Sequence, residues 1–464
     1  MKRMQPLNAR SVVTGLLAVS VWTLVGTGNA AVAADPLQEA LKVPGAKPTL
    51  PVSIAKEPFH TDFIAQARKY WSNFHMQMGG DHAVYYALHM SEFMTTALAK
   101  PSGDVSVLKR TLDENVGNTT LMHGNGQRSA SLNDYVNNPE HRVQGIMILH
   151  HGNVVYESYP GMKPNGSHLW ASTAKTTVGL LATLLEADGV LDTNLPVSHY
   201  VEEFKGSAWD NVKVIDVLNM TTGLDIAETP EATINPDSMF QRQLAADFGV
   251  PNSHGIKEKG LDVLKGAKPL KGEKPGEIAR YSSLATKVGV YIIEHATKRP
   301  FTELFEERVW SKIGARDSMG IIVSSDGSAN PYGIVFSRLD DFARYALIYT
   351  PSWKVVSDQQ IVTPAILKTL QTSGSPIAYK KGDFVNGNFL AEAFGKDQPE
   401  RNSRQWDRVW TDGAMFKHGN LYQGIYVDPA RDVVGVYFST SPVTGNPDIL
   451  PGYLRQAAKN LSEK

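Results

Sequence analysis

Between Trp170 and Gly189 the chain reads WASTAKTTVGLLATLLEADG, which has helical periodicity and apolar side chains on nearly every face. A helix of this kind is stable only inside a large core, so the rest of the fold must enclose it. Ser172 and Lys175 stand at its beginning, three residues apart, and positions with this spacing share one face. The sequence therefore predicts a hydroxyl and an amine in contact at the start of a buried helix.

A lysine at the start of a buried helix loses part of its hydration, and this loss disfavours the ammonium form. The pKa of Lys175 should therefore fall, and its neutral amine can accept the proton of the Ser172 hydroxyl and make it a nucleophile. The helix N-terminus offers free N–H groups that favour an oxyanion beside the serine. A serine three residues before a lysine also arises often by chance, so the pair alone is a weak motif.

The composition excludes several other classes of protein. The 464 residues include 46 Lys plus Arg and 47 Asp plus Glu, a balance that gives no basic surface for nucleic acid. The chain has no cysteine, so disulfides, zinc–thiolate sites and cysteine nucleophiles are excluded. No pair of histidines has the spacing of a metal site, and no glycine-rich phosphate loop precedes a helix. We therefore expect no metal and no cofactor.

The first residues have the pattern of a secretory signal peptide. A positively charged start precedes an apolar run over residues 11–27, and small residues follow, with Ala31 and Ala33 at the positions of a cleavage site. The alternative is a single membrane anchor, for which the run is at the short limit of spanning length. We expect a signal peptide over residues 1–33, cleavage near Ala33, and a periplasmic or secreted protein without a stable membrane anchor.

Strand patterns lie near both ends of the remaining chain, and helical patterns fill the middle. Two β-prone runs in VQGIMILHHGNVVYESYPG flank Gly152 and Asn153, which predicts a hairpin. A second β-rich stretch covers residues 409–440, with a turn at DPARD. This order predicts an α/β (α+β) fold, in which an antiparallel sheet from both chain ends is flanked by helices.

The predicted domain organisation has two parts after the signal peptide. Residues 34–110 form an N-terminal extension that packs on the core, and residues 111–464 form the main domain. A mainly helical region is inserted into the main domain at about 190–345. Within the extension, the segment from Tyr85 to Lys100 is equally compatible with a helix and with an extended arm.

These patterns resemble the serine β-lactamase and penicillin-binding-protein superfamily. More narrowly, SRLDDFARYALIY and QGIYVDPARDVVGVYFST are similar to segments of the class C-related serine hydrolases, and LHMSEFMTTA is similar to the 6-aminohexanoate-dimer hydrolase branch. The resemblance runs from about Gln144 to about Ser441. It implies a β-lactamase/transpeptidase-like fold with three motifs around a nucleophilic serine.

Two of the motifs lie on helix starts. The first motif of the superfamily, S-x-x-K, falls on Ser172 and Lys175. The second, Y-x-N, is matched by YSS, so Tyr281 takes the place of the tyrosine and Ser283 that of the asparagine. The resemblance implies that Tyr281 is held partly ionised by a lysine amine and shuttles protons to the leaving group. The alternative for Tyr281 is a tyrosine that packs on the core at a strand-to-helix junction.

The third motif, K-T-G or H-T-G, is matched by Lys417, His418 and Gly419, or one residue later by 418–420. The resemblance implies that the glycine lets substrate approach the backbone and that the lysine or histidine holds charge near the serine. An oxyanion hole would then combine the backbone N–H of Ser172 with one near Gly419. The missing threonine weakens the resemblance to carboxylate recognition in true β-lactamases. The alternative is an ordinary strand with a surface lysine.

The sequence therefore leads to one functional hypothesis and two alternatives. The hypothesis is an exported serine hydrolase that acts on an ester or amide bond through a covalent acyl-serine intermediate. The first alternative is a β-lactamase or D,D-peptidase of the same fold, and the second is a catalytically silent periplasmic binding domain. The expected partner is a small-molecule ester or amide and not a nucleic acid, whereas the oligomeric state is left open.

Overall fold

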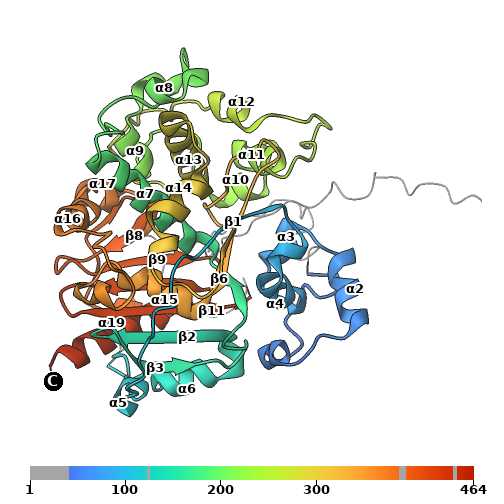
Figure 1. Cartoon of the computed structure of the whole chain (residues 1–464). Coiled ribbons are helices and arrows are strands. Elements are labelled where there is room, and N and C mark those ends of the chain that lie inside the picture. Colours follow the sequence, from blue (N-terminus) through green and yellow to red (C-terminus); the bar gives the residue numbers. More distant parts are fainter. Residues whose placement is uncertain (1–40, 123–125, 386–392, 443–446, 464) are drawn as a thin grey trace, which may run out of the picture.

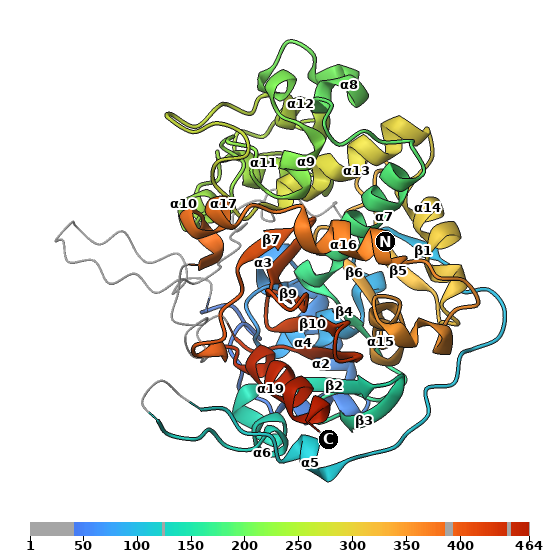
Figure 2. The ribbon, with the colours of Figure 1, turned by 90° about the vertical axis from the view of Figure 1, so that its left-hand side faces the viewer.

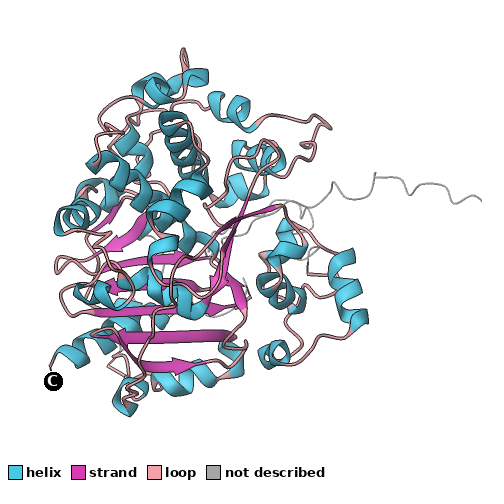
Figure 3. Cartoon of the chain, viewed as in Figure 1, coloured by secondary structure: helices cyan, strands magenta, loops and turns pink. Residues whose placement is uncertain are grey.

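The computed structural model of the protein describes residues 41–122, 126–385, 393–442 and 447–463 (Figure 1). The expected signal peptide, residues 1–33, lies outside these ranges. Most strands gather in one half of the molecule, and the helices from the middle of the chain gather in the other half (Figure 3). Antiparallel sheets flanked by helices confirm the predicted α/β fold class.

The larger sheet has seven antiparallel strands, and neighbouring strands come from distant parts of the chain. Its order is β3 (Asn153–Ser158), β2 (Val143–His150), β11 (Val433–Ser439), β10 (Gln423–Asp428), β9 (Met415–Gly419), β8 (Trp406–Val409) and β7 (Arg401–Ser403). The early hairpin joins the late strands through β2 and β11, with Val433 opposite His150 and Tyr437 opposite Ile146. The sheet is therefore built from both ends of the chain, as the sequence predicts.

Both faces of the central strands are buried, so β2, β9, β10 and β11 each contribute to two apolar cores. In β2, Met147 and Leu149 belong to one core, whereas Ile146 and Ile148 belong to the other. On the first face, α15 (Leu339–Leu347) packs on β2, β10 and β11. On the second face, α19 (Leu450–Ser462) lies across the strands and packs on β10 (Figure 2). The two-sided burial explains why the sequence of β2 is a continuous apolar run.

Two short helices complete the second face. They are α5 (Glu114–Gly117) and α6 (Leu132–Asn137). Their buried residues Val116, Leu132 and Val136 belong to the same core as Leu454 of α19. The segment that precedes β2 in the chain is thereby packed against this face of the sheet.

The hairpin of β2 and β3 turns one residue earlier than the sequence predicts. His150 pairs with Asn153, so the turn consists of His151 and Gly152, whose φ angles are 49° and 72°. A two-residue loop with positive φ at both positions matches the right-handed twist of the flanking strands. Asn153 therefore belongs to β3 and not to the turn.

A second, four-stranded sheet joins the N-terminal extension to the core. Its order is β1 (Thr96–Ala99), β5 (Met319–Ile322), β6 (Val335–Arg338) and β4 (Ser167–Leu169). The extension also contains the helices α2 (Thr61–Lys69), α3 (Asn73–Met76) and α4 (Asp81–Leu88). Because the segment from Tyr85 to Lys100 holds the end of α4 and the whole of β1, both of its predicted conformations occur, one after the other.

The middle of the chain is mainly helical and surrounds a central helix, α7 (Lys175–Ala187), which packs against α13, α14 and α16. The other helices are α8 (Val197–Tyr200), α9 (Val214–Leu218), α10 (Pro230–Ile234), α11 (Met239–Asp247), α12 (Gly260–Lys265), α13 (Ser283–Thr297), α14 (Phe301–Arg308), α16 (Pro364–Thr372) and α17 (Pro376–Lys381). The strands β5 and β6 also lie between residues 190 and 345. Within the described ranges, no helix combines the length and the apolar character needed to cross a membrane.

Candidate active site

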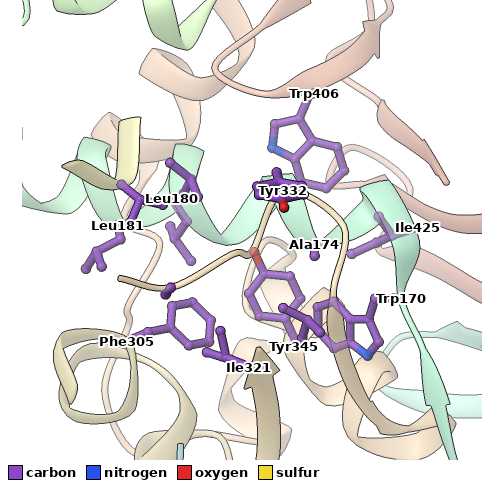
Figure 4. Close-up of a cluster of buried hydrophobic side chains, with 14 of the residues drawn as sticks. Trp170, Ala174, Leu180, Leu181, Phe305, Ile321, Tyr332, Tyr345, Trp406 and Ile425 are labelled. Atoms are coloured by element: carbon purple, nitrogen blue, oxygen red, sulfur yellow. The ribbon is translucent and has the colours of Figure 1, made fainter. Parts of the chain in front are cut away.

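The start of α7 is enclosed by the core. Side chains from five other elements pack around it: Phe305 from α14, Ile321 from β5, Tyr345 from α15, Trp406 from β8 and Ile425 from β10 (Figure 4). Residues 175–185 of the helix are all buried. The prediction of a helix surrounded by core on nearly every side is therefore confirmed.

A short 3₁₀ turn, Ala171–Ala174, leads into α7 and carries Ser172. Trp170 anchors the turn, because its backbone N–H donates to the Val335 carbonyl at 2.8 Å and its indole N–H to the Ser337 hydroxyl at 2.9 Å. Ala171 has a φ of 46°, in the region that side chains other than glycine rarely adopt. In this turn Ala171, Thr173 and Ala174 are buried, whereas Ser172 is partly exposed. Ser172 is thus the partly exposed residue of a turn that otherwise belongs to the core.

The amine of Lys175 is fully buried and has three polar contacts. Its Nζ lies 3.1 Å from Ser172 Oγ and 2.9 Å from Ser283 Oγ, and it also donates to the backbone carbonyl of Tyr332. Burial lowers the pKa of Lys175 to about 7; the Glu228 carboxylate opposes this shift and the Lys417 ammonium reinforces it. A substantial share of this amine is therefore neutral at physiological pH.

The hydrogen-bond pattern around Lys175 fits the neutral amine. The carbonyl of Tyr332 accepts only, and the Ser283 hydroxyl donates its own hydrogen to Glu228 Oε2 at 2.6 Å, so both of these partners accept from Lys175. A neutral amine has two N–H groups for these two acceptors and one lone pair. That lone pair faces Ser172, so the geometry suits transfer of the serine proton to Lys175.

Tyr281 lies just before α13 and between two lysine side chains. Lys417 Nζ is 3.2 Å from its hydroxyl, and the Nζ atoms of Lys175 and Lys417 lie 5.3 Å and 4.8 Å from its ring centre. Burial raises the pKa of Tyr281 well above its ordinary value, the carboxylates of Asp407 and Glu228 raise it further, and a hydrogen bond with Ser172 lowers it. Desolvation and the two carboxylates therefore favour the neutral phenol over the partly ionised form that the resemblance implies, although Arg408 acts in the opposite direction. The phenol holds its proton and can donate it.

The third motif reaches the site through Lys417, which supports the register 417–419. Adjacent residues of a strand point to opposite faces, so Lys417 and His418 cannot both face the serine. The fully buried Lys417 meets Tyr281, whereas His418 Nε2 lies 3.2 Å from Asp448 Oδ2 on the other side of β9. Of the two residues expected to hold charge near the serine, Lys417 or His418, the geometry therefore favours Lys417. The backbone N–H of His418 is also engaged, since it donates to Asp407 Oδ2 at 3.1 Å.

Gly419 brings the end of β9 against the serine turn. A Cβ atom at this position would lie 2.9 Å from the Trp170 carbonyl oxygen, 3.1 Å from Ala171 Cβ and 2.9 Å from Gln423 Cβ. Two of these neighbours belong to the segment that positions Ser172. The position therefore admits only glycine at the present spacing between β9 and the turn.

We expect Gly419→Ala to reduce kcat/KM by roughly 100-fold, because a shift of about 1 Å at the nucleophile has an effect of this size. Overpacking should also lower the free energy of unfolding by about 1–3 kcal/mol. Steady-state kinetics and a thermal melt check both effects. Gly206→Ala is the control, since its φ is 73° and no atom lies within 4 Å of the added Cβ. This variant should lose stability but keep its activity, and an equally active Gly419→Ala would contradict the prediction.

The sequence assigns no individual role to three residues of the site: Glu228, Tyr332 and Asp407. Glu228 and Tyr332 both lie in loops. Glu228 accepts a hydrogen bond from Ser283 through its carboxylate, and Tyr332 accepts one from Lys175 through its backbone carbonyl, so no local sequence pattern marks either residue. Asp407 carries a detectable signal, because it is an acidic residue inside the apolar strand segment QWDRVW. An acidic residue in a buried strand needs a cationic partner, and here the partner is Lys417, 2.7 Å away.

The part of the chain that the structure describes contains no group of three or more His, Cys, Asp or Glu side chains arranged to hold a metal ion. The sequence suggests two segments that line the substrate pocket, namely the loop from Glu228 to Gly276 and YKKGDFVNGNFLAEAFGKDQ at residues 379–398. Phe384 from the second segment packs edge-on against Tyr281, with ring centres 5.8 Å apart. Residues 386–392 of that segment lie outside the described residues.

Comparison with known proteins places this site in a family. The β-lactamase family model matches residues 132–459, and the chain therefore belongs to the β-lactamase family. The chain is 26% identical over 308 residues to a 6-aminohexanoate-dimer hydrolase of Paenarthrobacter ureafaciens, a match that covers 65% of this chain and 73% of that protein. It is also 33% identical over 94 residues to a β-lactamase of Providencia stuartii, which covers 20% of this chain and 24% of that protein.

Solved structures show the same fold at lower sequence identity. A structure from Bacillus anthracis, described as a candidate 6-aminohexanoate-dimer hydrolase, aligns with a TM-score of 0.63 and 19% identity, over 82% of this chain and 93% of that one. EstCE1, described as a hydrolase with promiscuous acyltransferase activity, aligns with a TM-score of 0.50 and 17% identity, over 69% of this chain and 94% of that one. Family and fold together make this protein a hydrolase of the serine β-lactamase fold.

Proposed function

We propose that this protein is an exported serine hydrolase that cleaves an ester or amide bond through a covalent acyl-serine intermediate. The observation that carries the proposal is the contact of 3.1 Å between Ser172 Oγ and the buried amine of Lys175. With a pKa of about 7, this amine can accept a proton at neutral pH. The neutral amine donates its two N–H groups to Ser283 and to the Tyr332 carbonyl, so its lone pair is available to Ser172.

In acylation, Ser172 Oγ bonds to the carbonyl carbon of the substrate while its proton moves to Lys175 Nζ. The bond between the carbonyl carbon and the leaving group then breaks, and the leaving oxygen or nitrogen takes a proton. Tyr281 donates that proton from its neutral phenol and regains one from Lys175. In deacylation, water adds to the acyl carbon, gives a proton back through the same groups and releases the acid and the free serine.

Negative charge on the substrate oxygen needs two donors. The proposed donors are the backbone N–H of Ser172 and one N–H at the end of β9 near Gly419. The close packing of Gly419 on the carbonyl of Trp170 and on Ala171 supports this pairing, because it holds the end of β9 beside the serine turn. The backbone N–H of His418 is not part of the pair, since it donates to Asp407.

A serine-directed fluorophosphonate tests the proposal directly. We expect the reagent to label the protein at Ser172, as shown by peptide mass spectrometry, and we expect p-nitrophenyl esters or short linear amides to be hydrolysed. Labelling at another residue would overturn the assignment of the nucleophile. Absence of both labelling and turnover would instead favour the catalytically silent binding domain. A chromogenic cephalosporin in the same assay tests the β-lactamase alternative.

Export is the second part of the proposal, and the charged start, apolar run and small-residue exit of residues 1–33 support it. N-terminal sequencing of the protein expressed from its full gene tests it. We expect a mature chain that begins near Ala34, in the periplasm or the medium. Membrane-bound protein with Met1 intact would contradict cleavage.

A further inference from the structure

Lys417 has its whole hydrogen-bonding capacity engaged inside the protein. Its Nζ lies 3.2 Å from the Tyr281 hydroxyl, 2.7 Å from Asp407 Oδ2 and 2.8 Å from the His418 carbonyl oxygen. A lysine ammonium has three donors and no acceptor. A substrate carboxylate that approached Lys417 would therefore have to displace one of these partners.

Asp407 is the residue that neutralises Lys417. The side chains of Asp407 and Lys417 are 5% and 0% exposed, so this ion pair is shielded from water. Asp407 Oδ2 accepts from Lys417 Nζ and from the His418 backbone N–H, which fixes the carboxylate in two directions. Among the described residues, no hydrogen-bond donor reaches its other oxygen, Oδ1. The hydrogen bonds of Asp407 are thus concentrated on one oxygen, which Lys417 and the His418 backbone N–H share.

The remaining charges near the serine balance one another. Arg408 Nη1 lies 3.9 Å from Asp407 Oδ2, and the carboxylate of Glu228 lies on the Lys175 side of the site. When Lys175 is neutral, the negative charges of Asp407 and Glu228 balance the positive charges of the other two cations, Lys417 and Arg408. An anionic group that enters such a partly dehydrated site finds no net positive charge to compensate for its lost hydration.

We propose that Asp407 is a specificity-determining residue that restricts this hydrolase to substrates whose leaving group carries no negative charge next to the scissile bond. The inference rests on the proposed acyl-serine function. Lys417 contacts Tyr281, which protonates the leaving group, so the leaving-group side of the cleft is the side that Lys417 faces. By occupying Lys417, Asp407 removes the cation that would otherwise attract a carboxylate to that side.

Two matched esters test the proposal on the full-length mature protein. They are 3-carboxyphenyl acetate, whose leaving group is anionic, and its methyl ester, whose leaving group has a similar shape but no charge. The measurement is the ratio of kcat/KM for the anionic ester to kcat/KM for the neutral ester. We expect wild-type protein to prefer the neutral ester by at least about tenfold, after correction for the intrinsic reactivity of the two esters in buffer.

Asp407→Asn keeps an oxygen acceptor for Lys417 but removes the charge, so the ratio should rise about tenfold toward the anionic ester. Because the Asp407–Lys417 pair is shielded from water, added salt should change this gain only slightly. Glu202→Gln is the control, since it removes an exposed carboxylate that pairs with Lys205, and it should leave the ratio unchanged.

A wild-type protein that hydrolyses both esters equally well would overturn the proposal, even if Asp407→Asn did not fold. An unchanged ratio in a folded and active Asp407→Asn variant would overturn it as well. Failure of the proposed function gives a different result: neither ester would be hydrolysed, and fluorophosphonate would not label Ser172.

Discussion

Lys175→Arg should reduce kcat/KM by about 10³-fold although it retains the positive charge, because general-base catalysis typically contributes 10²–10⁴-fold. An arginine cannot lose its proton near neutral pH, so it cannot accept the proton of Ser172. Its planar group also does not fit the three contacts of Lys175 Nζ with Ser172, Ser283 and the Tyr332 carbonyl. The measurement is kcat/KM on one activated ester, with a thermal melt to show that the variant folds. A rate near that of wild type would exclude Lys175 as the base.

Measuring kcat/KM of the wild-type protein on the same ester over pH 5 to 10 tests the protonation state of Lys175. In the proposed mechanism the active form is the neutral amine, which predominates above a pKa of about 7. The value of kcat/KM should therefore rise with pH through about 7 and then level off, with an apparent pKa that belongs to the coupled groups. A rate that fell as the pH rose from 6 to 8 would contradict a neutral base.

Tyr281→Phe belongs to the same prediction, because the proposed mechanism passes one proton between Lys175 and Tyr281. Tyr281→Phe alone should lower kcat/KM with little change in packing, since the ring is kept. The double variant should be scarcely worse than the poorer single variant, because members of one catalytic set are non-additive. Losses that multiplied independently would mean that the two residues act in separate steps.

Ser172→Ala should reduce turnover by at least about 10⁴-fold, as removal of a nucleophile does in other covalent catalysts. The change removes one hydroxyl and its contact with Lys175, so the free energy of unfolding should fall by only about 1 kcal/mol. Ser167→Ala is the matched control, because Ser167 is a partly exposed serine of β4 outside the site. It should keep both full activity and fluorophosphonate labelling. Turnover in Ser172→Ala with an unchanged melting temperature would refute the role of this serine.

The local part of the site was predictable from the sequence. Ser172 and Lys175 are three residues apart on one helix, so their contact follows from helical geometry alone. Tyr281 and Lys417 are 136 residues apart, and only the family pattern suggested that they meet. Adjacent residues of a strand point to opposite faces, so the register 417–419 of the third motif would by itself have predicted that His418 points away from Lys417.

The partner carboxylates were less accessible to prediction, because their roles come from tertiary contacts. Glu228 reaches the site only through its contact with Ser283, which lies 55 residues further along the chain. In the fold, the long strands and amphipathic helices were evident from periodicity. The strands β4, β5 and β6 have only three or four residues each, too few to show alternation, and so were missed.

The pairing of β2 with β11 has a consequence for how the chain reaches its native state. Val433 of β11 pairs with His150 of β2. This contact at the centre of the sheet therefore joins segments that lie nearly 300 residues apart in the chain. Contacts of such long range slow folding, because the intervening chain must lose its freedom before the contact forms. A ribosome-bound chain that lacks residues 433–439 therefore presents β2 as an apolar strand with one unpaired edge. The sheet can be completed only when the last strand has been made, and an unpaired apolar edge favours aggregation until then.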